Sequence, residues 1–339
     1  MRKITLQDVA EAAGVSVATA SWSINDNEKH RIPANTRNRV RKIAESLGYQ
    51  PNALGKGLVQ GTSDLIGFVT DDVATMPFAG QIIKGAQDEA WRSGKLLLII
   101  DTGGKESVEN KALTMMAEQQ VQGIIYSTWY HRPVESLKLQ SERPAVLVNC
   151  FDMHDLYPAI VPDEVQGGRT ATELLVKAGH RRIAFVNTTS PSPARTGRLE
   201  GYKQVLEEAG ISRDSSLIMY AKPDQEGGFN VTESLVESGA TAVFCHNDRV
   251  AMGIYDGLKQ KGLSIPDDIS VVGFDDQSVI SAHLHPALTT VGLPHYDLGV
   301  LGIRKLLKIC NDKSDEQKVG TTRVKCPPVI RDSIKRLQF

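Results

Sequence analysis

Hydrophobic positions change their spacing along the 339-residue chain and divide it into two parts. Residues 6–13, 17–24 and 33–47 carry apolar residues at helical intervals, which predicts three short helices. From Leu65 onward, short apolar runs alternate with amphipathic stretches. The runs lie at 65–69, 96–100, 121–125, 145–148, 183–186, 242–245 and 269–272, and the helices at about 79–93, 107–119, 167–178, 198–209, 229–238, 248–261 and 296–308. This alternation predicts an α/β core of doubly wound parallel sheets.

The first two helical stretches predict a helix-turn-helix. Thr5 stands three residues before Asp8, which resembles a capping box, and Gly14 can take the left-handed conformation that ends a helix. Ser16 can then cap the next helix. The second helix of such a motif can enter a DNA major groove. The alternative is an ordinary helical hairpin at the start of an enzyme.

The charge of the chain is unevenly distributed. The whole sequence has a net charge of −1, but residues 1–60 carry nine Lys or Arg and five acidic residues. The head is therefore basic and the remainder acidic. This distribution favours a small DNA-binding module attached to a larger body with another task, and the length allows two or three domains.

Further features of the sequence bear on localisation and on metal sites. No apolar run reaches the roughly 18 residues that a membrane span requires, and polar residues recur from Arg2 onward, unlike a secretory signal. The cysteines at positions 150, 245, 310 and 326 are widely separated and form no CxxC motif. We therefore expect a cytoplasmic protein with reduced thiols and without a metal site.

The common enzyme motifs are missing from the sequence. No G-x-G-x-x-G follows a predicted strand, and there is no Walker, G-x-S-x-G or H-E-x-x-H sequence. Side chains suited to binding hydroxyl groups follow the predicted strands, at the edge where such sheets bind ligands. They are Asp72, Asp101, Asn149, Asn247, Asp248 and Asp275. Each could equally be a turn or capping residue, and Asp248 is expected to cap the helix after it. Ligand binding without catalysis or a cofactor is the simpler interpretation.

Several motifs occur in the order found in one known family. The head carries Thr5-Leu-x-Asp-Val-Ala-x-x-Ala-Gly-Val-Ser and Leu47-Gly-Tyr-x-Pro-Asn. The body carries His180-Arg-Arg-Ile-Ala-Phe-Val, Arg198-Leu-Glu-Gly-Tyr and Asp268-Ile-Ser-Val-Val-Gly-Phe-Asp-Asp. Through these motifs the chain resembles the lactose-repressor (LacI/GalR) family of transcriptional regulators over essentially its whole length.

The resemblance implies a domain organisation. A helix-turn-helix DNA-binding domain is expected at 1–48, a hinge at 49–61, and an effector-binding and dimerisation core at 62–339. The core should resemble a periplasmic sugar-binding protein (type I) with two lobes. The first lobe is expected at about 62–161 and 291–324, and the second at about 162–290 and 325–339. A homodimer that reads a palindromic operator in double-stranded DNA is also implied.

The resemblance also implies which head residues contact DNA. Val17, Ala18 and Trp22 would point at base edges in the major groove, where the family usually carries an Arg or another polar residue in place of Trp22. Readout would then depend on thymine methyl groups, and the operator sequence cannot be carried over from the family. The alternative is that Trp22 packs on the surface of the head itself. Residues suited to phosphate contacts are Ser16, Thr19, Ser21 and Asn25.

The hinge is expected to fold in the minor groove. Leu58 stands where the family places a wedge that unstacks the central base step, and Lys56 and Asn52 are expected to contact the DNA. The alternative for Leu58 is a linker leucine that packs on the core.

In the core, three residues match positions that hold the effector in similar proteins, and four more are expected around the same cleft. The matching residues are Arg198, Asn247 and Asp275, and the others are Asp72, Phe78, Trp129 and Asn149. Arg and Asp side chains suit sugar hydroxyls, and Trp129 could either stack on a sugar or anchor its loop. The function implied is a repressor that a small effector, a sugar or sugar derivative, switches allosterically. A transport-system sugar-binding protein and a sugar-modifying enzyme are the alternatives.

Overall fold

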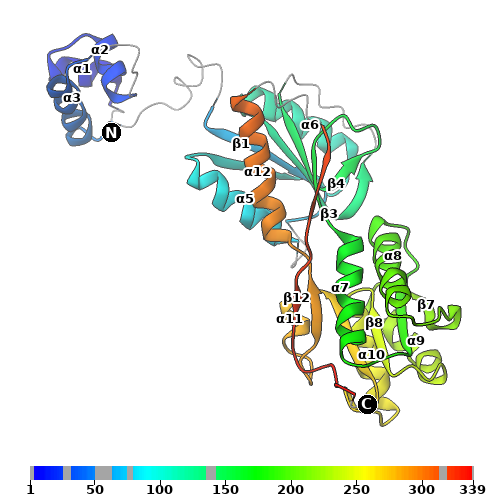
Figure 1. The fold of residues 1–339 in the computed structure, drawn as a ribbon. Helices are drawn as coiled ribbons and strands as arrows, with labels where there is room; N and C mark the ends of the chain where they lie inside the picture. Colours follow the sequence, from blue (N-terminus) through cyan, green and yellow to red (C-terminus); the bar gives the residue numbers. More distant parts are fainter. Residues whose placement is uncertain are drawn as a thin grey trace. The chain divides into compact units, whose positions relative to one another are not determined.

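Figure 1 shows the computed structural model of the chain, which describes residues 4–25, 32–49, 63–74, 79–134, 143–312 and 319–337. The chain divides into two compact units, a head (Met1–Asp64) and a core (Leu65–Phe339). Among the described residues, no helix has both the length and the apolar character needed to cross a membrane.

The described residues of the head form three helices, α1 (Leu6–Ala13), α2 (Val17–Ile24) and α3 (Ala34–Ser46). The predicted capping box is confirmed, because Thr5 and Asp8 each accept a hydrogen bond from the backbone N–H of the other. Gly14 is left-handed, with φ 60° and ψ 41°, and the Ser16 side chain caps α2. Small apolar side chains from all three helices let them pack closely into one core. These side chains are Val9, Ala10, Ala13, Ala20, Val40 and Ala44.

The first lobe of the core is a six-stranded parallel sheet covered on both faces (Figure 1). Its strands, in spatial order, are β11 (Thr321–Val324), β5 (Ala159–Pro162), β4 (Ala145–Asp152), β3 (Ile124–Val134), β1 (Leu65–Thr70) and β2 (Leu96–Asp101). Helices α5 (Gly80–Arg92) and α12 (His295–Asn311) pack together on one face, and α6 (Glu106–Glu118) covers the other. Strand β2 lies at the edge of the sheet.

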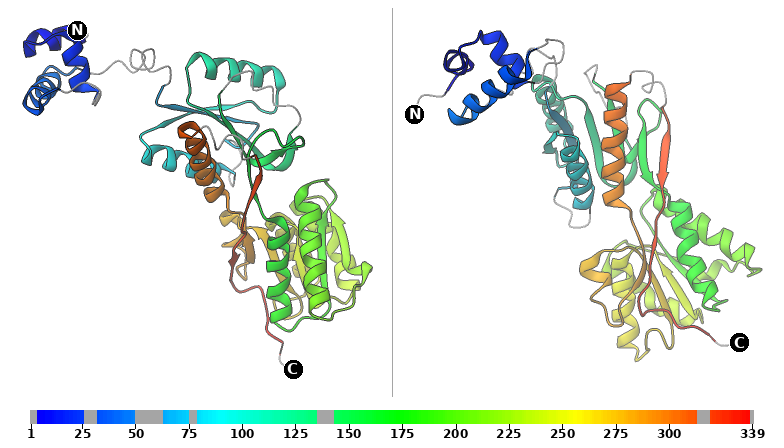
Figure 2. Two further views of the ribbon diagram at one scale, coloured as in Figure 1. Left: turned by 45° about the horizontal axis from the view of Figure 1, so that its top comes forward. Right: turned by 60° about the vertical axis from the view of Figure 1, so that its left-hand side comes forward.

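The second lobe repeats this arrangement. Its strands, in spatial order, are β12 (Pro328–Val329), β10 (Thr289–Gly292), β9 (Ser270–Asp275), β8 (Ala242–Cys245), β6 (Ile183–Thr188) and β7 (Ile218–Ala221). All pairs are parallel except β10 with β12. Helices α7 (Glu164–Lys177) and α8 (Pro193–Glu208) cover one face, and α9 (Gln225–Glu237) and α10 (Asp248–Gln260) the other (Figure 2). A short helix, α11 (Ser278–Ser281), precedes β10.

The chain passes between the two lobes three times. The passages join β5 to α7, β10 to α12, and β11 to β12. The second passage follows Gly292, so Val291 and Gly292 belong to the sheet of the second lobe and not to the first lobe as expected. The pairing of β10 with β9 determines this boundary, and strand pairing cannot be seen in the pattern of apolar residues along the sequence.

Three predicted helix starts are wrong. Helices α7, α8 and α9 begin at Glu164, Pro193 and Gln225, three to five residues before the positions that the sequence predicts. Glycines near the starts of α7 and α8 allow these helices to pack closely. A Cβ atom on Gly168 of α7 would lie 2.7 Å from the Cα atom of Arg198 in α8, and one on Gly197 would lie 2.6 Å from the Cβ atom of Glu164.

We predict that Gly168→Ala lowers the free energy of unfolding by about 1–3 kcal/mol, because the added methyl group meets backbone atoms that cannot rotate away. Gly80→Ala in α5 is the matched control, since a Cβ atom there meets nothing within 4 Å. Denaturant unfolding of both variants measures the difference. Equal stability of the two variants would contradict the close packing of α7 against α8.

Candidate effector site and DNA-contacting surface

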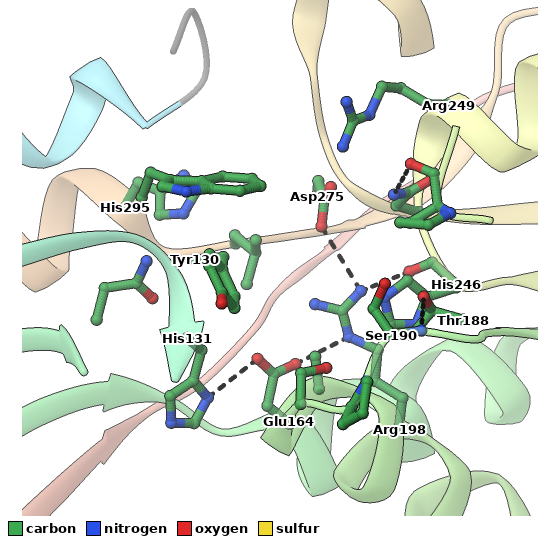
Figure 3. A pocket seen from close by; sticks show the side chains of 18 residues that line it. Tyr130, His131, Glu164, Thr188, Ser190, Arg198, His246, Arg249, Asp275 and His295 are labelled. Carbon is green, nitrogen blue, oxygen red and sulfur yellow. Dashed lines mark hydrogen bonds and ion pairs between the residues drawn. The ribbon is translucent and has the colours of Figure 1, made fainter. Parts of the chain in front are cut away.

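A cavity of about 380 Å³ lies between the two lobes of the core (Figure 3). The first lobe contributes the outer end of β3 together with Asn149, and the second lobe contributes the ends of β6, β8 and β9 and the start of α8. The volume is within the range of small-molecule sites. Five of the residues predicted to hold an effector line this cavity: Trp129, Asn149, Arg198, Asn247 and Asp275.

A buried ion pair forms the floor of the cavity in the second lobe. Arg198 of α8 donates from Nε to Oε2 of Glu164 at 2.8 Å, and both side chains are about 95% buried. Arg198 also donates from Nη1 to the carbonyl oxygen of His246 and lies 3.6 Å from Oδ1 of Asp275. Its guanidinium carbon stands 3.6 Å from the centre of the Phe274 ring. These contacts hold the guanidinium group in one position.

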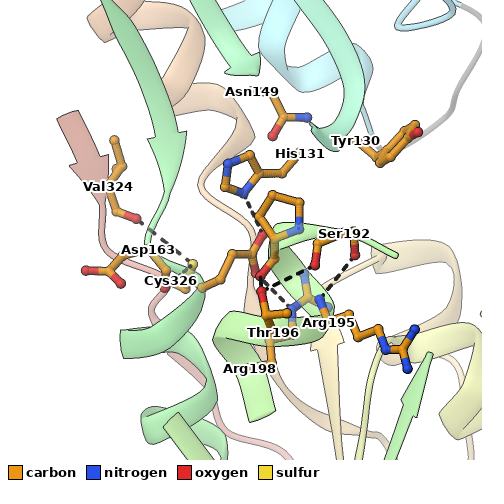
Figure 4. A network of polar contacts seen from close by, with 12 residues as sticks. Tyr130, His131, Asn149, Asp163, Ser192, Arg195, Thr196, Arg198, Val324 and Cys326 are labelled. Atoms are coloured by element: carbon orange, nitrogen blue, oxygen red, sulfur yellow. Dashed lines mark hydrogen bonds and ion pairs between the residues drawn. The ribbon is translucent and has the colours of Figure 1, made fainter. Parts of the chain in front are cut away.

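The same ion pair reaches across to the first lobe. His131, near the end of β3, places Nδ1 3.3 Å from Oε1 of Glu164, and its side chain is 9% exposed. The His131 ring packs edge-on against Phe151 of β4. Glu164 therefore contacts Arg198 within its own lobe and His131 in the other (Figures 3 and 4).

Burial and nearby charges shift the pKa values of the two cavity carboxylates, Glu164 and Asp275, in opposite directions. Burial alone would raise the pKa of Glu164, but Arg198 and His131 lower it to about 2. Burial raises the pKa of Asp275 to about 6, against the opposing effect of Arg198. Arg198 is closer to Glu164 than to Asp275, which accounts for the difference.

Beneath the cavity, Asp248 is fully buried and ties α10 to neighbouring elements. It accepts hydrogen bonds from Thr290 Oγ1 at 2.6 Å and from the backbone N–H of Gln277 at 2.7 Å. Burial, followed by the charge of Asp275, raises its pKa. The prediction that Asp248 caps α10 is wrong, because Asn247 is the cap and accepts from the N–H of Val250. The amide of Asn247 donates to the carbonyl of Pro223, so both ends of this side chain are engaged.

Of the two remaining predicted effector residues, one does not line the cavity. Asp72 does not line it; the neighbouring Asp71 instead accepts from the Trp129 backbone N–H and from Arg132, which fixes the end of β3. Phe78 lies outside the described residues. Among the described residues, no cluster of three or more potential metal ligands occurs.

Sequence reasoning missed several cavity residues, notably His131, Glu164, His246 and Arg249. Glu164 was missed because Ala159-Ile-Val161 stands between two prolines and is too short to predict strand β5. His131 was missed because the apolar run that predicts β3 stops nine residues before the strand does. His246 directly follows β8, so the strand-end rule already pointed to its position.

In the head, the residues predicted to face DNA lie on or beside α2. Val17 is 46% exposed, Ala18 is exposed, and Trp22 is half-buried. The hydroxyl groups of Ser16 and Thr19 form a hydrogen bond with an oxygen–oxygen distance of 2.9 Å. The side-chain amide of Asn25 donates to the Ser21 hydroxyl at 3.4 Å. The predicted hinge residues Asn52, Lys56 and Leu58 lie outside the described residues.

Both units match models of known families. Residues 5–52 match the model described as bacterial regulatory proteins, lacI family. Residues 63–328 match the model described as periplasmic binding proteins and sugar binding domain of LacI family. The second match covers more than half of the chain.

Curated relatives and solved structures match along most of the chain. It is 31% identical over 330 residues to the HTH-type transcriptional regulator GalR of Escherichia coli, covering 96% of this chain and 94% of GalR. It is 30% identical over 321 residues to catabolite control protein A of Priestia megaterium, covering 93% and 95%. The lac repressor dimer bound to operator and the anti-inducer ONPF matches with a TM-score of 0.77 and 26% identity, covering 98% of this chain and 100% of that one. A LacI family regulator from Enterococcus faecium with bound ribose matches with a TM-score of 0.64 and 26% identity, covering 81% and 100%.

The two cavity carboxylates lead to opposite pH effects on stability. Glu164 has a lowered pKa, so its contribution is present above pH 4.5 and is lost as the pH falls toward about 2. At pH 7 we therefore expect Glu164→Gln to lower the free energy of unfolding by about 3 kcal/mol.

Asp275 has a raised pKa, so its ionised form costs stability as the pH rises from about 4 through 6. The stability of the Asp275→Asn variant relative to the wild-type protein should therefore increase over that pH interval.

Denaturant unfolding of both variants at pH 4, 5, 6 and 7 tests these expectations. The stability difference between Asp275→Asn and wild type should shift in favour of the variant by about 2–3 kcal/mol between pH 4 and pH 7. A difference that is flat or changes in the opposite direction would contradict the assigned environment of Asp275.

Proposed function

Since the chain belongs to the LacI family of bacterial regulatory proteins, a family of DNA-binding transcriptional regulators, we propose that it is a cytoplasmic, homodimeric repressor. It binds a palindromic operator through two heads and is switched by a sugar bound between the lobes of the core. The observation that carries this proposal is the presence in one chain of a capped helix-turn-helix and a core cavity with a fixed Arg198 and a neighbouring Asp275.

The reading surface of α2 is apolar in this proposal. Val17 and Ala18 are exposed at the start of the helix, where they can meet thymine methyl groups in the major groove. Ser16, Thr19, Ser21 and Asn25 contact phosphates, and the half-buried Trp22 borders the same surface. The hinge of residues 49–61 orders on the operator, with Leu58 as a wedge between base pairs. This division of roles also assigns residues 1–48 to DNA and residues 62–339 to effector and dimer.

The effector cavity offers the polar groups that a sugar needs. Arg198 has donors directed into a space that Asp275 also borders, and this pairing suits neighbouring hydroxyl groups. Trp129 supplies an aromatic face for an apolar sugar surface. The regulator from Enterococcus faecium binds ribose in a core of similar fold, which supports the same chemical class here.

Allosteric coupling is proposed to pass through Glu164. Its carboxylate contacts Arg198, which would hold the effector, and also His131 in the other lobe. An effector that shifts Arg198 therefore changes a contact between lobes. If the core has two lobe arrangements with different affinities for the effector, effector binding favours one of them. The switch between the arrangements would then change the spacing of the two heads.

The homodimer is proposed to form through the β2 side of the first lobe. This strand lies at the sheet edge and exposes Leu96 (57%) and Ile99 (37%). Trp91 of α5 and Met115 of α6 add exposed apolar surface, at 66% and 43%. An uncovered apolar sheet edge favours association with a second copy. The matching lac repressor is a dimer, which supports a second copy of this chain as the partner at this surface.

The operator proposal is tested by gel shift with the full-length protein and the DNA upstream of its own gene. Val17→Asp places a negative charge on the reading surface, where we expect at least a tenfold loss of operator affinity from phosphate repulsion. An acidic residue in the first turn favours the helix, so the head should remain folded. The matched control is Val279→Asp, at a core position that is 72% exposed. Equal binding by both variants, or no binding by the wild-type protein at low salt, would sink the proposal.

The dimer proposal is tested by sedimentation. Leu96→Glu should shift the protein toward monomer and weaken operator binding at least tenfold, because one head then binds a half-site alone. Met153→Glu changes an exposed residue of the same lobe (64%) and should leave both properties unchanged. A Leu96→Glu protein that remains dimeric would place the interface elsewhere.

A further inference from the structure

His246 occupies a fixed position in the wall of the effector cavity (Figure 3). It directly follows β8, and the residue is only 7% exposed. Its backbone N–H donates to the carbonyl of Val186 at 2.8 Å, and its carbonyl accepts from Arg198. The backbone is therefore held on both sides, by the neighbouring strand and by the proposed effector-binding arginine.

The imidazole ring of His246 has no hydrogen-bond partner among the described residues. Its Nδ1 atom is buried and unpartnered. Its Nε2 atom also lacks a protein partner but is not closed off, so it is the nitrogen that meets the cavity. A ligand that fills the cavity excludes water from Nε2, so it must supply the hydrogen bond of that atom or leave the atom unsatisfied.

The charges around the ring restrict the chemistry of that ligand. Burial, followed by the charge of Arg198, lowers the pKa of His246 well below its usual value, so the ring is neutral at pH 7. Two arginines act on the ring. The charge of Arg198 is opposed by Glu164 at 2.8 Å and Asp275 at 3.6 Å, and Arg249, which also lines the cavity, is near enough to Asp275 to act against the rise in its pKa. A charged ligand group beside His246 would thus find no counter-charge on the ring. A hydroxyl group suits it, because a hydroxyl can both donate and accept.

We propose that Nε2 of His246 forms a hydrogen bond with a hydroxyl group of an uncharged sugar and is a specificity-determining contact of the effector site. This proposal rests on the sugar effector proposed above and adds the residue and the charge class. A bound sugar that lacks the hydroxyl would cover Nε2 and leave it unsatisfied, and sites that bind a hydroxyl in this way discriminate strongly against analogues without it.

Three substitutions separate this contact from a packing role. Gln can place its amide near the position of Nε2, whereas Asn reaches only the position of Nδ1, and Phe keeps a ring without nitrogen. Thermal-shift measurements on the full-length protein with D-ribose, D-glucose, D-galactose and cellobiose, and with glucose 6-phosphate and gluconate as charged counterparts, identify the probe that stabilises the wild-type protein most. Calorimetry then gives its Kd for each variant.

We expect an uncharged sugar to be the strongest probe. His246→Gln should bind it within about threefold of wild type, and His246→Asn and His246→Phe at least about tenfold more weakly. Deoxy derivatives of the probe give a second measurement. One of them should bind wild type more weakly than the parent sugar but should bind His246→Phe as well as the parent does. Should His246→Phe not fold, the comparison of Gln with Asn decides alone.

The failures of the two proposals are distinguishable. A parent sugar that binds wild type and His246→Phe, or the Gln and Asn variants, equally well overturns the role of His246 and leaves the sugar effector in place. A charged compound as the strongest probe overturns the charge class proposed for the ligand. No stabilisation of the wild-type protein by any sugar contradicts the sugar effector and this contact together.

Discussion

The buried ion pair between Glu164 and Arg198 is the interaction on which the core cavity depends. Removing two charges from water costs several kcal/mol per ion, and mutual attraction offsets this only when the remaining donors also find partners. Here several of them do: the guanidinium also meets the His246 carbonyl and the Phe274 ring, and the carboxylate also meets His131. Replacing such a buried pair by well-packed hydrophobic residues often leaves stability unchanged or raises it. The pair is better explained by position, because it orients a guanidinium toward the cavity and links it to the first lobe.

The close packing of α7 against α8 brings the two charged residues together. Gly168 faces the backbone of Arg198, and Gly197 faces Glu164, so the two charged residues and the two glycines alternate along one helix contact. A side chain at either glycine would separate the helices and lengthen the ion pair. The packing of the second lobe and the geometry of the cavity are therefore determined by the same residues.

The sequence predicts the architecture well and the cavity only in part. Apolar periodicity locates seven of the strands and the main helices, because burial on one or both faces leaves a direct pattern. It misplaces the starts of α7 and α8, which begin three and five residues before the predicted positions. Glu164, the first residue of α7, was missed together with the short strand β5 before it, and its role needs a three-dimensional neighbour. Arg198, Asn149 and Asp275 were placed correctly at the cavity, since strand ends and family motifs mark them, whereas Asp72 was not, because Asp71 holds the end of β3.

The head shows how a small motif can divide its polar atoms between folding and recognition. The Ser16 hydroxyl oxygen accepts from the Thr19 N–H and also meets the Thr19 hydroxyl. Each hydroxyl carries one hydrogen, and their mutual bond uses only one of the two. The other hydrogen stays available to a phosphate while the cap remains intact. The neighbouring Val17 and Ala18 have no side-chain hydrogen-bonding atoms, so in the proposed docking sequence readout at these positions would come from shape and methyl contact. The polar atoms can then position the helix on the backbone without taking part in base selection.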